Sequence, residues 1–350
     1  MTKKHWYGIG LMSGTSLDGL DLVYTQITKN KQYSYKIIAT ETFPYSNNWR
    51  KKLQNAFTSS ALEITRLNTE YGKFLGKITN TFIKKNNISK LDFIASHGHT
   101  IFHKPGENYT LQIGDGATLA QTCKQTVVCD FRTQDVAKGG QGAPLVPIGD
   151  SLFFSAYDYC INIGGFANIS FDDMGVRKAF DICPANIILN HYTGKIALEY
   201  DDKGLLAKSG EINNELLTAL NNLPLYKKRE SLGYEIIISD FIPLIDSFNL
   251  SIPNILRTVV EHIAIKIAQN LSPNTQSLIT GGGALNNYLI ERIKFHTKST
   301  IIIPSRELID YKEALIFSLL GLLRLQNKVN VLASVTGADK NHSSGVIYYP

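Results

Sequence analysis

The pattern of apolar and polar positions predicts that the chain begins with a β-hairpin. Residues 6–11 are a short apolar run, residues 12–19 are rich in glycine, serine, threonine and aspartate, and apolar positions return at 22–25. Such a mixture between two apolar runs is typical of a tight turn between antiparallel strands. A further stretch at 35–39 predicts a third strand.

The next part of the chain alternates between helical and strand patterns. Apolar residues recur at helical spacing over 49–85, which predicts a pair of helices. Short apolar runs predict strands at 93–96, 110–113 and 125–129, and an alanine-rich helix is expected to start near Asp115. The first third of the chain is therefore predicted to be mixed α/β.

A second hairpin is predicted beyond a glycine-rich segment at 139–142, which suits a hinge or a ligand-binding loop. Its strands are expected at 159–163 and 167–171, joined by Gly164 and Gly165. Because this hairpin repeats the outline of the first, the sequence indicates a duplicated architecture.

Beyond residue 201 the pattern is mainly helical. The clearest helix is expected to begin at Ser251, with Pro253 in its first turn. The elements expected after it are a strand at 277–280, a turn of three glycines, a helix at 286–294, a strand at 301–303 and a helix at 312–325.

Composition limits the class of protein. A chain of 350 residues is long enough for two domains of roughly 150 residues each. Its 43% apolar and 19% charged residues are typical of a folded globular protein and exclude general disorder or a coiled coil. The 36 basic and 30 acidic side chains give a net charge of +6, which suits anionic small molecules and is too diffuse to indicate nucleic acid.

The cysteines and the apolar segments favour a cytoplasmic protein without a membrane segment. Four cysteines occur without a C-x-x-C pair, so they are expected to be reduced, buried thiols and not zinc ligands or disulfides. The N-terminal residues lack the apolar core of a signal peptide. The longest apolar stretch, 314–323, is about half the length of a membrane span.

Three glycine turns are candidates for binding phosphate or nucleotide. They lie at 10–19, at 164–165 and at 281–283. Glycine turns expose backbone N–H groups and let phosphate oxygens approach, and nearby hydroxyls add donors. None of the three matches the P-loop or the dinucleotide-binding pattern.

The order of these turns resembles the superfamily of actin, hexokinase and heat-shock chaperone ATPases. Within it, the chain is similar from end to end to the anhydro-N-acetylmuramic acid kinase family. The matching stretches are GLMSGTSLDGLD at 10–21, SHGHT at 96–100, LQIG at 111–114, DFR at 130–132, GGQGAPLVP at 139–147, NIGGFAN at 162–168, GGG at 281–283, EA at 313–314 and SVTGA at 334–338.

The resemblance implies a fold and a division of the chain. The fold is α/β, a two-lobed actin-like ATPase (ribonuclease H-like) fold with duplicated mixed β-sheet domains and an interdomain cleft. The first lobe would comprise 1–132 and 329–350 and carry the first phosphate hairpin. The second would comprise 133–328 and carry the second phosphate turn, the catalytic aspartate and the adenosine motif.

The resemblance also implies an activity. The enzyme would use ATP and Mg2+ to phosphorylate O6 of 1,6-anhydro-N-acetylmuramic acid while water opens the anhydro ring. The products would be N-acetylmuramic acid 6-phosphate and ADP, in amino sugar metabolism and peptidoglycan recycling. Its partners would be these small molecules, with no nucleic acid and no membrane, and a homodimer is left open.

By this resemblance Asp181 is the base that activates water. The family carries Asp-x-Gly-Pro-Gly-Asn, and here the stretch at 181–186 reads DICPAN, so Cys183 and Ala185 replace the two glycines. Considered without the family, Asp181 follows Phe180 at an expected strand end. It could equally be an ordinary acidic residue before a helix that starts near Pro184.

The family implies a role for each glycine turn. The residues expected to hold the ATP phosphates are Gly10, Ser13, Gly14, Thr15, Ser16, Asp18, Gly19, Gly164 and Gly165. Those expected to hold the adenosine are Gly281, Gly282 and Gly283. Asp18 is also a candidate for a water-mediated contact to Mg2+, although it could simply close the hairpin through an Asx-turn.

The residues expected in the sugar site are His97, Arg132 and Glu313. Glu313 could instead be only a first-turn acid of its helix. The spacing of His97, His99 and His103 could also seat a transition metal, because alternate strand residues share a face.

Three alternatives stay open. Altered sugar-side motifs leave room for a related kinase acting on a different amino sugar. Cys183 and Ala185 leave room for a catalytically weak nucleotide-binding protein of the same fold. A hydrolase with Ser13 or Ser96 as nucleophile is the third, but neither serine lies in a G-x-S-x-G context.

Overall fold

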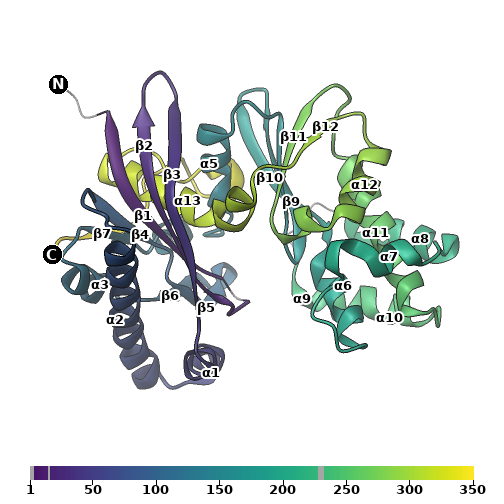
Figure 1. Cartoon of the computed structure of the whole chain (residues 1–350), viewed down its shortest axis with the longest axis horizontal. Coiled ribbons are helices and arrows are strands. Elements are labelled where there is room, and N and C mark those ends of the chain that lie inside the picture. Colours follow the sequence, from purple (N-terminus) through teal and green to yellow (C-terminus); the bar gives the residue numbers. More distant parts are fainter. Residues whose placement is uncertain (1–3, 15, 228–231) are drawn as a thin grey trace. The chain divides into compact units, whose positions relative to one another are not determined.

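The computed structural model of the chain describes residues 4–14, 16–227 and 232–350. It divides into two compact units, whose elements are labelled in Figure 1. The first unit comprises Met1–Phe154 and Tyr311–Pro350, and the second comprises Ser155–Asp310.

The lobe boundaries drawn from the resemblance stay a prediction. The compact units group 133–154 and 311–328 with the first unit. Thr15, one of the predicted phosphate ligands, lies outside the described residues.

The first unit is built on a six-stranded sheet in the order β13-β7-β4-β1-β2-β3. Neighbouring strands β1, β2 and β3 are antiparallel, and β4 and β7 continue the sheet parallel to β1. The bounds are β1 His5–Ser13, β2 Gly19–Lys29, β3 Tyr33–Pro44, β4 Phe93–Ser96, β7 Val127–Cys129 and β13 Val346–Tyr348. Strands β5 (His99–Lys104) and β6 (Tyr109–Ile113) form a separate two-stranded sheet.

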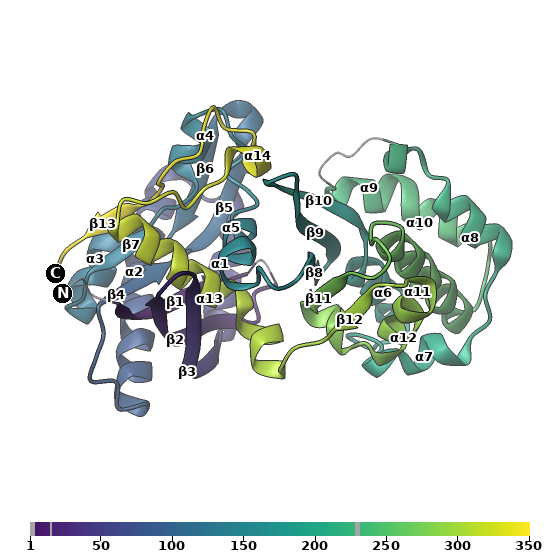
Figure 2. The ribbon, with the colours of Figure 1, turned by 90° about the horizontal axis from the view of Figure 1, so that it is seen from above.

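Helices cover both faces of the first sheet (Figures 1 and 2). Side chains of Ile9 and Leu11 share a buried cluster with α2 and α3, whereas Gly8 and Gly10, pointing to the other face, lie against α13. The helices are α1 Asn47–Asn55, α2 Ala61–Lys85, α3 Gly116–Cys123, α4 Thr133–Ala137, α5 Val146–Phe153, α13 Arg306–Leu325 and α14 Ala333–Thr336, with η1 Ala56–Thr58 and η2 Pro105–Glu107. Helix α2 starts at a capping box of Ser60 and Glu63.

The second unit repeats the strand order of the first. Its sheet runs β10-β9-β8-β11-β12, with β8, β9 and β10 antiparallel and β11 and β12 parallel to β8. The bounds are β8 Tyr159–Ile163, β9 Phe166–Asp173, β10 Val176–Pro184, β11 Gln276–Thr280 and β12 Thr300–Ile302. This order and these directions match β3-β2-β1-β4-β7, so the predicted duplicated α/β fold is confirmed.

The helices of the second unit include α11, which is mostly buried and packs against α6, α7, α8 and α12. The helices are α6 Asn186–Gly194, α7 Leu205–Ser209, α8 Asn214–Asn221, α9 Tyr234–Ile236, α10 Ile242–Asp246, α11 Ile252–Ala268 and α12 Asn287–His296, with η3 Asp202–Gly204, η4 Pro224–Lys227, η5 Ile237–Phe241 and η6 Gly282–Leu285. Helix α11 begins after Ser251, as predicted.

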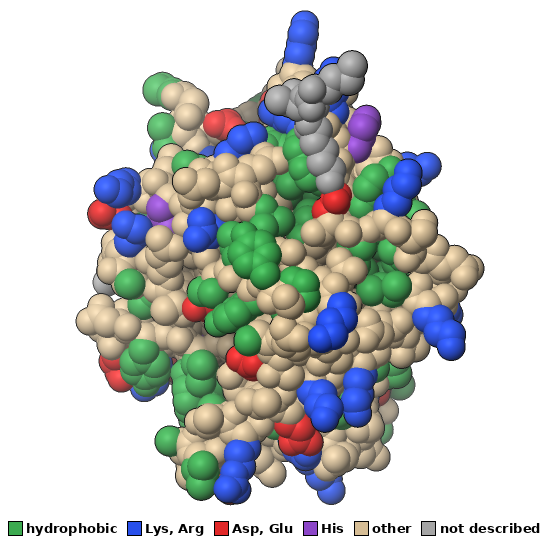
Figure 3. All heavy atoms as spheres, turned by 90° about the vertical axis from the view of Figure 1, so that its left-hand side faces the viewer, with side chains coloured by type: hydrophobic (Ala, Val, Ile, Leu, Met, Phe, Trp, Pro, Cys, Tyr) green, Lys and Arg blue, Asp and Glu red, His purple; other side chains and the backbone are tan. Residues whose placement is uncertain are grey.

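The cysteines, the helices and the surface charge can be compared with what the composition predicted. All four cysteines are free and buried, as predicted. No helix in the described ranges is long and apolar enough to cross a membrane. On the face of the molecule drawn in Figure 3, Lys and Arg side chains are spread over the surface, with Asp and Glu among them.

Candidate functional site

Two of the glycines predicted to hold phosphate are required by packing. A Cβ on Gly10 would lie 1.9 Å from the backbone oxygen of Ala314, and a Cβ on Gly19 would lie 2.6 Å from the backbone oxygen of Phe43. Gly14 has open space instead, because a Cβ there would approach no atom beyond its chain neighbours closer than 3.6 Å. Packing therefore explains Gly10 and Gly19 without a ligand, but it does not explain Gly14.

Ser13, at the end of β1, is buried and hydrogen-bonded within the first unit. Its Oγ lies 2.8 Å from His99 Nδ1 and accepts a hydrogen bond from Tyr45 Oη at 2.7 Å. Tyr45 Oη is also bonded to Tyr71 Oη. Burial lowers the pKa of His99 to about 4, so the imidazole that is bonded to Ser13 is neutral near pH 7. The Ser13 side chain thus anchors the hairpin from inside.

Tyr45 also holds the other side of the hairpin tip. Its backbone N–H donates to the backbone oxygen of Asp18 at 3.3 Å. The Asp18 side chain is exposed. The Asp21 carboxylate accepts a hydrogen bond from Thr42 Oγ1 at 2.6 Å. Of the two acidic residues at this turn, Asp18 is therefore the more exposed.

The buried His99 predicts a loss of stability in acid. The pKa of His99 in the folded chain, about 4, lies below the ordinary value of 6.5. As pH falls from 6.5 to 4, His99 is therefore protonated in the unfolded chain but still neutral in the folded chain, which favours unfolding. We expect the free energy of unfolding to drop by roughly 2–3 kcal/mol per such histidine over this window.

Urea denaturation at pH 7 and at pH 4.5 measures this effect. The H99Q variant keeps an acceptor for Ser13 but cannot titrate, so it should lose less stability than the wild type across the same interval. Buried His97 and His262 have lowered pKa values too, which leaves a remaining acid dependence in the variant. Equal losses in both proteins would contradict the assignment to His99.

The structure brings His97 and Arg132 together. Arg132 Nε and Nη2 lie 3.0 and 2.9 Å from His97 Nε2, and His97 Nδ1 lies 3.0 Å from the Gly98 oxygen. Because a guanidinium only donates, Nε2 must be bare and Nδ1 must carry the proton. Burial, with Arg132 adding to it, holds the pKa of His97 well below its ordinary value.

Glu313 belongs to the same region of the first unit. It lies on α13 one turn before Phe317, whose ring centroid is 4.8 Å from that of His97 and 5.5 Å from that of Phe131. The Glu313 side chain is exposed, and its charge and that of Arg132 attract each other. All three residues predicted for the sugar site therefore gather at one place.

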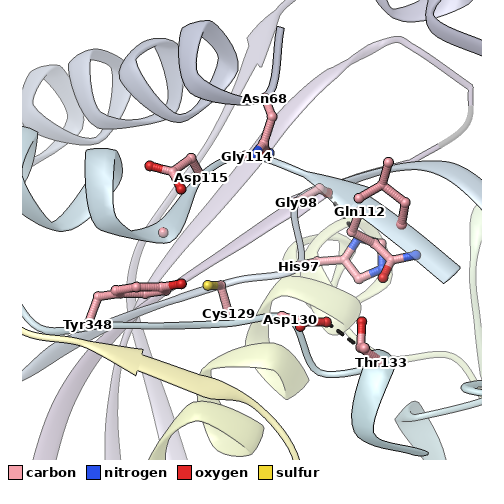
Figure 4. A pocket seen from close by; sticks show the side chains of 12 residues that line it. Asn68, His97, Gly98, Gln112, Gly114, Asp115, Cys129, Asp130, Thr133 and Tyr348 are labelled. Carbon is pink, nitrogen blue, oxygen red and sulfur yellow. Dashed lines mark hydrogen bonds between the residues drawn. The ribbon is translucent and has the colours of Figure 1, made fainter. Parts of the chain in front are cut away.

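A cavity of about 140 Å³ opens beside His97. In Figure 4 the Tyr348 ring and the Cys129 thiol lie on one side of it, and His97 and Gln112 lie on the other. The residues that line it are Asn68, His97, Gly98, Leu111, Gln112, Gly114, Asp115, Gly116, Cys129, Asp130, Thr133 and Tyr348. The cavity is polar and carries two carboxylates, those of Asp115 and Asp130.

The three histidines do not form a metal site. His99 Nδ1 is bonded to Ser13, and His103 Nδ1 lies 3.0 Å from Thr110 Oγ1. Among the residues that the structure describes, no group of three His, Cys, Asp or Glu side chains could hold a metal ion. The alternative of a transition-metal site at these histidines is therefore wrong.

In the second unit, the turn between β8 and β9 is bonded to the start of α6. Ala185 N donates to the Gly165 oxygen at 2.8 Å, and Asn186 N donates to the Gly164 oxygen at 3.2 Å. A Cβ on Gly164 or Gly165 would have no neighbour closer than 3.5 Å, and neither residue has a positive φ. Packing does not require glycine here, so the bare backbone is free to approach a ligand.

The three glycines after β11 differ from one another. Gly281 has φ +80, and a Cβ on it would lie 2.7 Å from the Ile163 oxygen. A Cβ on Gly283 would lie 2.2 Å from Ile163 Cγ2, whereas one on Gly282 would meet only Asn186 Nδ2 at 3.8 Å. Gly281 is therefore needed for the turn and Gly283 for packing against β8. Of the three, Gly282 is the one with open space around its backbone.

A hollow of about 480 Å³ lies beside this turn. It is lined by residues of η6 and α12 and by the residue that follows β12: Ala284, Asn287, Ile290, Glu291, Lys294 and Ile303. Apolar walls with a few polar groups are typical of sites for flat organic rings.

Asp181 lies within β10, not at its end as the sequence suggested. It faces Asn168 of β9, and the register shifts between Asp181 and Cys183. Ile182 and Cys183 are consecutive, yet both belong to the same buried cluster, whereas successive side chains of a regular strand point to opposite faces of the sheet. This bulge leaves Asp181 half-buried, with Oδ2 accepting a hydrogen bond from Leu232 N at 3.0 Å. Bulges are common beside active sites, where they re-aim a side chain.

The replacements of the family's glycines fit the backbone. Neither Cys183 nor Ala185 has a positive φ, and both side chains are fully buried in the core of the second unit. Burial raises the pKa of the Cys183 thiol, so it stays protonated. No positive φ at either position requires glycine.

Sequence reasoning missed Tyr45, Tyr71 and Asp135. Tyr45 and Tyr71 complete the hydrogen bonds of Ser13, and Asp135 is a fully buried carboxylate close to Arg132. In the sequence, each of these residues is only a polar group at an otherwise apolar position. That pattern suggests a buried hydrogen bond, but it does not show which distant residue is the partner.

The two units share one strand order, and each carries a glycine turn in its first hairpin, so the fold is that of a duplicated α/β protein. The chain belongs to the anhydro-N-acetylmuramic acid kinase family, whose model matches residues 6–350. The resemblance stated from the motifs is thereby confirmed.

Individual relatives cover nearly the whole chain. The anhydro-N-acetylmuramic acid kinase of Hydrogenovibrio crunogenus is 32% identical over 369 residues, covering 98% of this chain and 98% of the relative. That of Bacillus cereus strain AH187 is 33% identical over 385 residues, covering 98% and 99%. Among solved structures, the component A of (R)-2-hydroxyglutaryl-CoA dehydratase from Acidaminococcus fermentans has a TM-score of 0.48 at 14% identity, covering 90% of this chain and 97% of that one.

Proposed function

We propose that this protein phosphorylates O6 of 1,6-anhydro-N-acetylmuramic acid with ATP while water opens the anhydro ring. The products are N-acetylmuramic acid 6-phosphate and ADP. The observation that carries the proposal is the half-buried Asp181 at the β10 bulge, on a segment that continues directly into residues bonded to the Gly164–Gly165 turn. Family membership over residues 6–350 supports the choice of substrate.

In this reaction Asp181 accepts a proton from water. The water attacks C1 of the sugar, the C1–O6 bond breaks, and O6 attacks the γ-phosphorus as ADP leaves. One proton of the water goes to the carboxylate, so the charge that develops on the reacting atoms is neutralised. Leu232 N, which donates to Asp181 Oδ2, steadies the anionic form of the base.

ATP is bound by open backbone in this proposal. Gly14 and Gly165 present backbone that packing leaves open, and Ser16 adds an exposed hydroxyl. Gly164 lies in the same turn as Gly165, but its own N–H donates to the Phe166 oxygen at 3.1 Å, so it offers open space beside the phosphates and no free N–H donor. Gly282 and the apolar hollow beside α12 take the adenosine. Ser13, Gly10, Gly19, Gly281 and Gly283 shape these turns.

Mg2+ fits Asp18 as a minor ligand. The Asp18 carboxylate is exposed at the hairpin tip, and carboxylate oxygen is a ligand type that Mg2+ accepts. Mg2+ is usually held by one or two carboxylates together with substrate phosphates and water, so Asp18 alone would be a sufficient protein ligand. When bound, it neutralises charge on the phosphates.

The sugar is bound by His97, Arg132 and Glu313. Three of the five N–H donors of Arg132 are used by His97 and Gly142, which leaves two for an anionic group such as the lactyl carboxylate. The carboxylates of Asp115 and Asp130 in the cavity would repel that group. We therefore place the acetamido group, which donates an N–H, towards the cavity.

Product analysis tests the proposal. With ATP, Mg2+ and the anhydro sugar, we expect ADP in equal amount to a product heavier by one water and one phosphoryl group. In ¹⁸O-labelled water the label should enter the sugar and not the phosphate. A product lacking the added water indicates a related sugar kinase, and no ADP with any amino sugar indicates a weak nucleotide-binding protein. Small molecules are the only partners required. A cytoplasmic location and a homodimer stay predictions.

A further inference from the structure

Asp135, on the short helix α4 that follows Arg132, is a buried carboxylate without a role in the proposed chemistry. Its side chain is fully buried in the first unit. Oδ2 accepts a hydrogen bond from Gly142 N at 2.7 Å, and Oδ1 accepts one from Thr336 Oγ1 at 2.8 Å. His342 Nε2 lies 3.5 Å from Oδ1. A buried carboxylate is costly unless hydrogen-bond donors compensate it, and here the Gly142 N–H and the Thr336 hydroxyl do so.

Two stretches that the proposed chemistry leaves unexplained meet at this carboxylate. GGQGAPLVP supplies Gly142, and SVTGA supplies Thr336. Gln141 N also donates to the Thr336 oxygen at 2.7 Å, so the two stretches are joined directly. Gly140 must be glycine, because a Cβ there would lie 2.2 Å from Asp135 Oδ2.

The same loop holds Arg132. Gly142 donates its N–H to Asp135, and its carbonyl oxygen accepts from Arg132 Nη1 at 2.6 Å. Arg132 in turn donates to His97 Nε2 through two nitrogens. A continuous series of hydrogen bonds therefore leads from Asp135 through Gly142 and Arg132 to His97.

We propose that Asp135 is a positioning residue for the sugar site: its carboxylate fixes Gly142 so that the Gly142 carbonyl holds Arg132 against His97. The inference rests on the proposed sugar role of Arg132 and His97. Arg132 has a flexible side chain, and fixing one end of its guanidinium removes freedom that sugar binding would otherwise have to remove.

Two variants of Asp135 separate positioning from simple burial. In D135A the Gly142 N–H loses its acceptor, and we expect KM for the sugar to rise at least about tenfold while KM for ATP stays unchanged. In D135N the amide oxygen still accepts from Gly142, so KM for the sugar should return close to the wild-type value. T336V is the matched control, because it removes a buried donor to Asp135 but leaves the Gly142 bond in place.

The ¹⁵N resonances of His97 give a readout that does not depend on activity. In protein labelled with ¹⁵N-histidine, with His97 assigned from the H97Q spectrum, the Nε2 signal should shift in D135A and stay in place in D135N and T336V. An unchanged Nε2 signal and unchanged sugar KM in D135A would overturn the inference. So would a rise in sugar KM of equal size in T336V, since that would trace the effect to lost stability.

A wrong assignment of the sugar site would give a different result from a wrong assignment of Asp135. R132Q should raise the sugar KM on its own. If it does not, the sugar role of Arg132 is wrong, while the His97 signal in D135A still reports whether Asp135 holds Arg132 in place.

Discussion

Replacing Asp181 by Asn is expected to abolish phosphoryl transfer while ATP binding stays intact. Asn has the shape of Asp and keeps an oxygen for Leu232 N, but it cannot take a proton from water. A general base contributes roughly 10²–10⁴-fold to the rate, so kcat should fall by about that factor. The affinity for ATP should not change, because the open backbone assigned to the phosphates lies in other residues.

Steady-state kinetics and calorimetric titration with ATP measure the two effects separately. D173N is the matched control, since Asp173 is a partly exposed carboxylate on β9, the strand beside β10, and pairs with Lys178. Exposed ion pairs contribute little to stability, so D173N should behave as wild type. Turnover near the wild-type rate in D181N would remove Asp181 from its role.

The glycines of the first hairpin should respond in opposite ways to substitution. In G10A the new methyl group would lie 1.9 Å from the Ala314 oxygen, so α13 must move away from β1. We expect G10A to lose about 3 kcal/mol of unfolding free energy. In G14A the methyl group meets open space, so stability should hold while KM for ATP rises about tenfold, because the added Cβ keeps phosphate oxygens from the backbone.

Urea denaturation and ATP titration of both variants decide between packing and ligand binding. A stable G10A protein with weakened ATP binding would show that Gly10 contacts the nucleotide. A G14A protein with unchanged KM for ATP would exclude the hairpin tip as a phosphate site.

The sequence predicted most elements because their signals are local. Apolar periodicity and turn residues marked β1, β2, β8, β9 and α11 within a few positions of their observed bounds. Strand β5 was not predicted, and β10 was expected only as a strand ending near Phe180, because each is stabilised by a partner strand more than by its own pattern. The position of Asp181 was wrong for the same reason: a bulge is a property of two paired strands.

In the candidate site, too, the residues could be named from local motifs, but their contacts could not. His97, Arg132 and Glu313 were named from motifs, but their meeting point depends on α13, which is far from His97 along the chain. No motif distinguishes Gly10, which packs against α13, from Gly14, which has open space. The partners of Ser13 and Asp135 come from segments up to 201 residues away.

By itself, the sequence determined the order of helices and strands, the duplication of a hairpin with a glycine turn, and membership of a kinase family, because periodicity, turn chemistry and motifs are carried by neighbouring residues. Only the tertiary structure showed which glycines have open space around their backbone and which are closely packed against other parts of the chain. It also decided that Asp181 sits at a bulge and that Asp135 supports Arg132. These depend on distances between residues that are remote in the chain, and only the folded packing sets such distances.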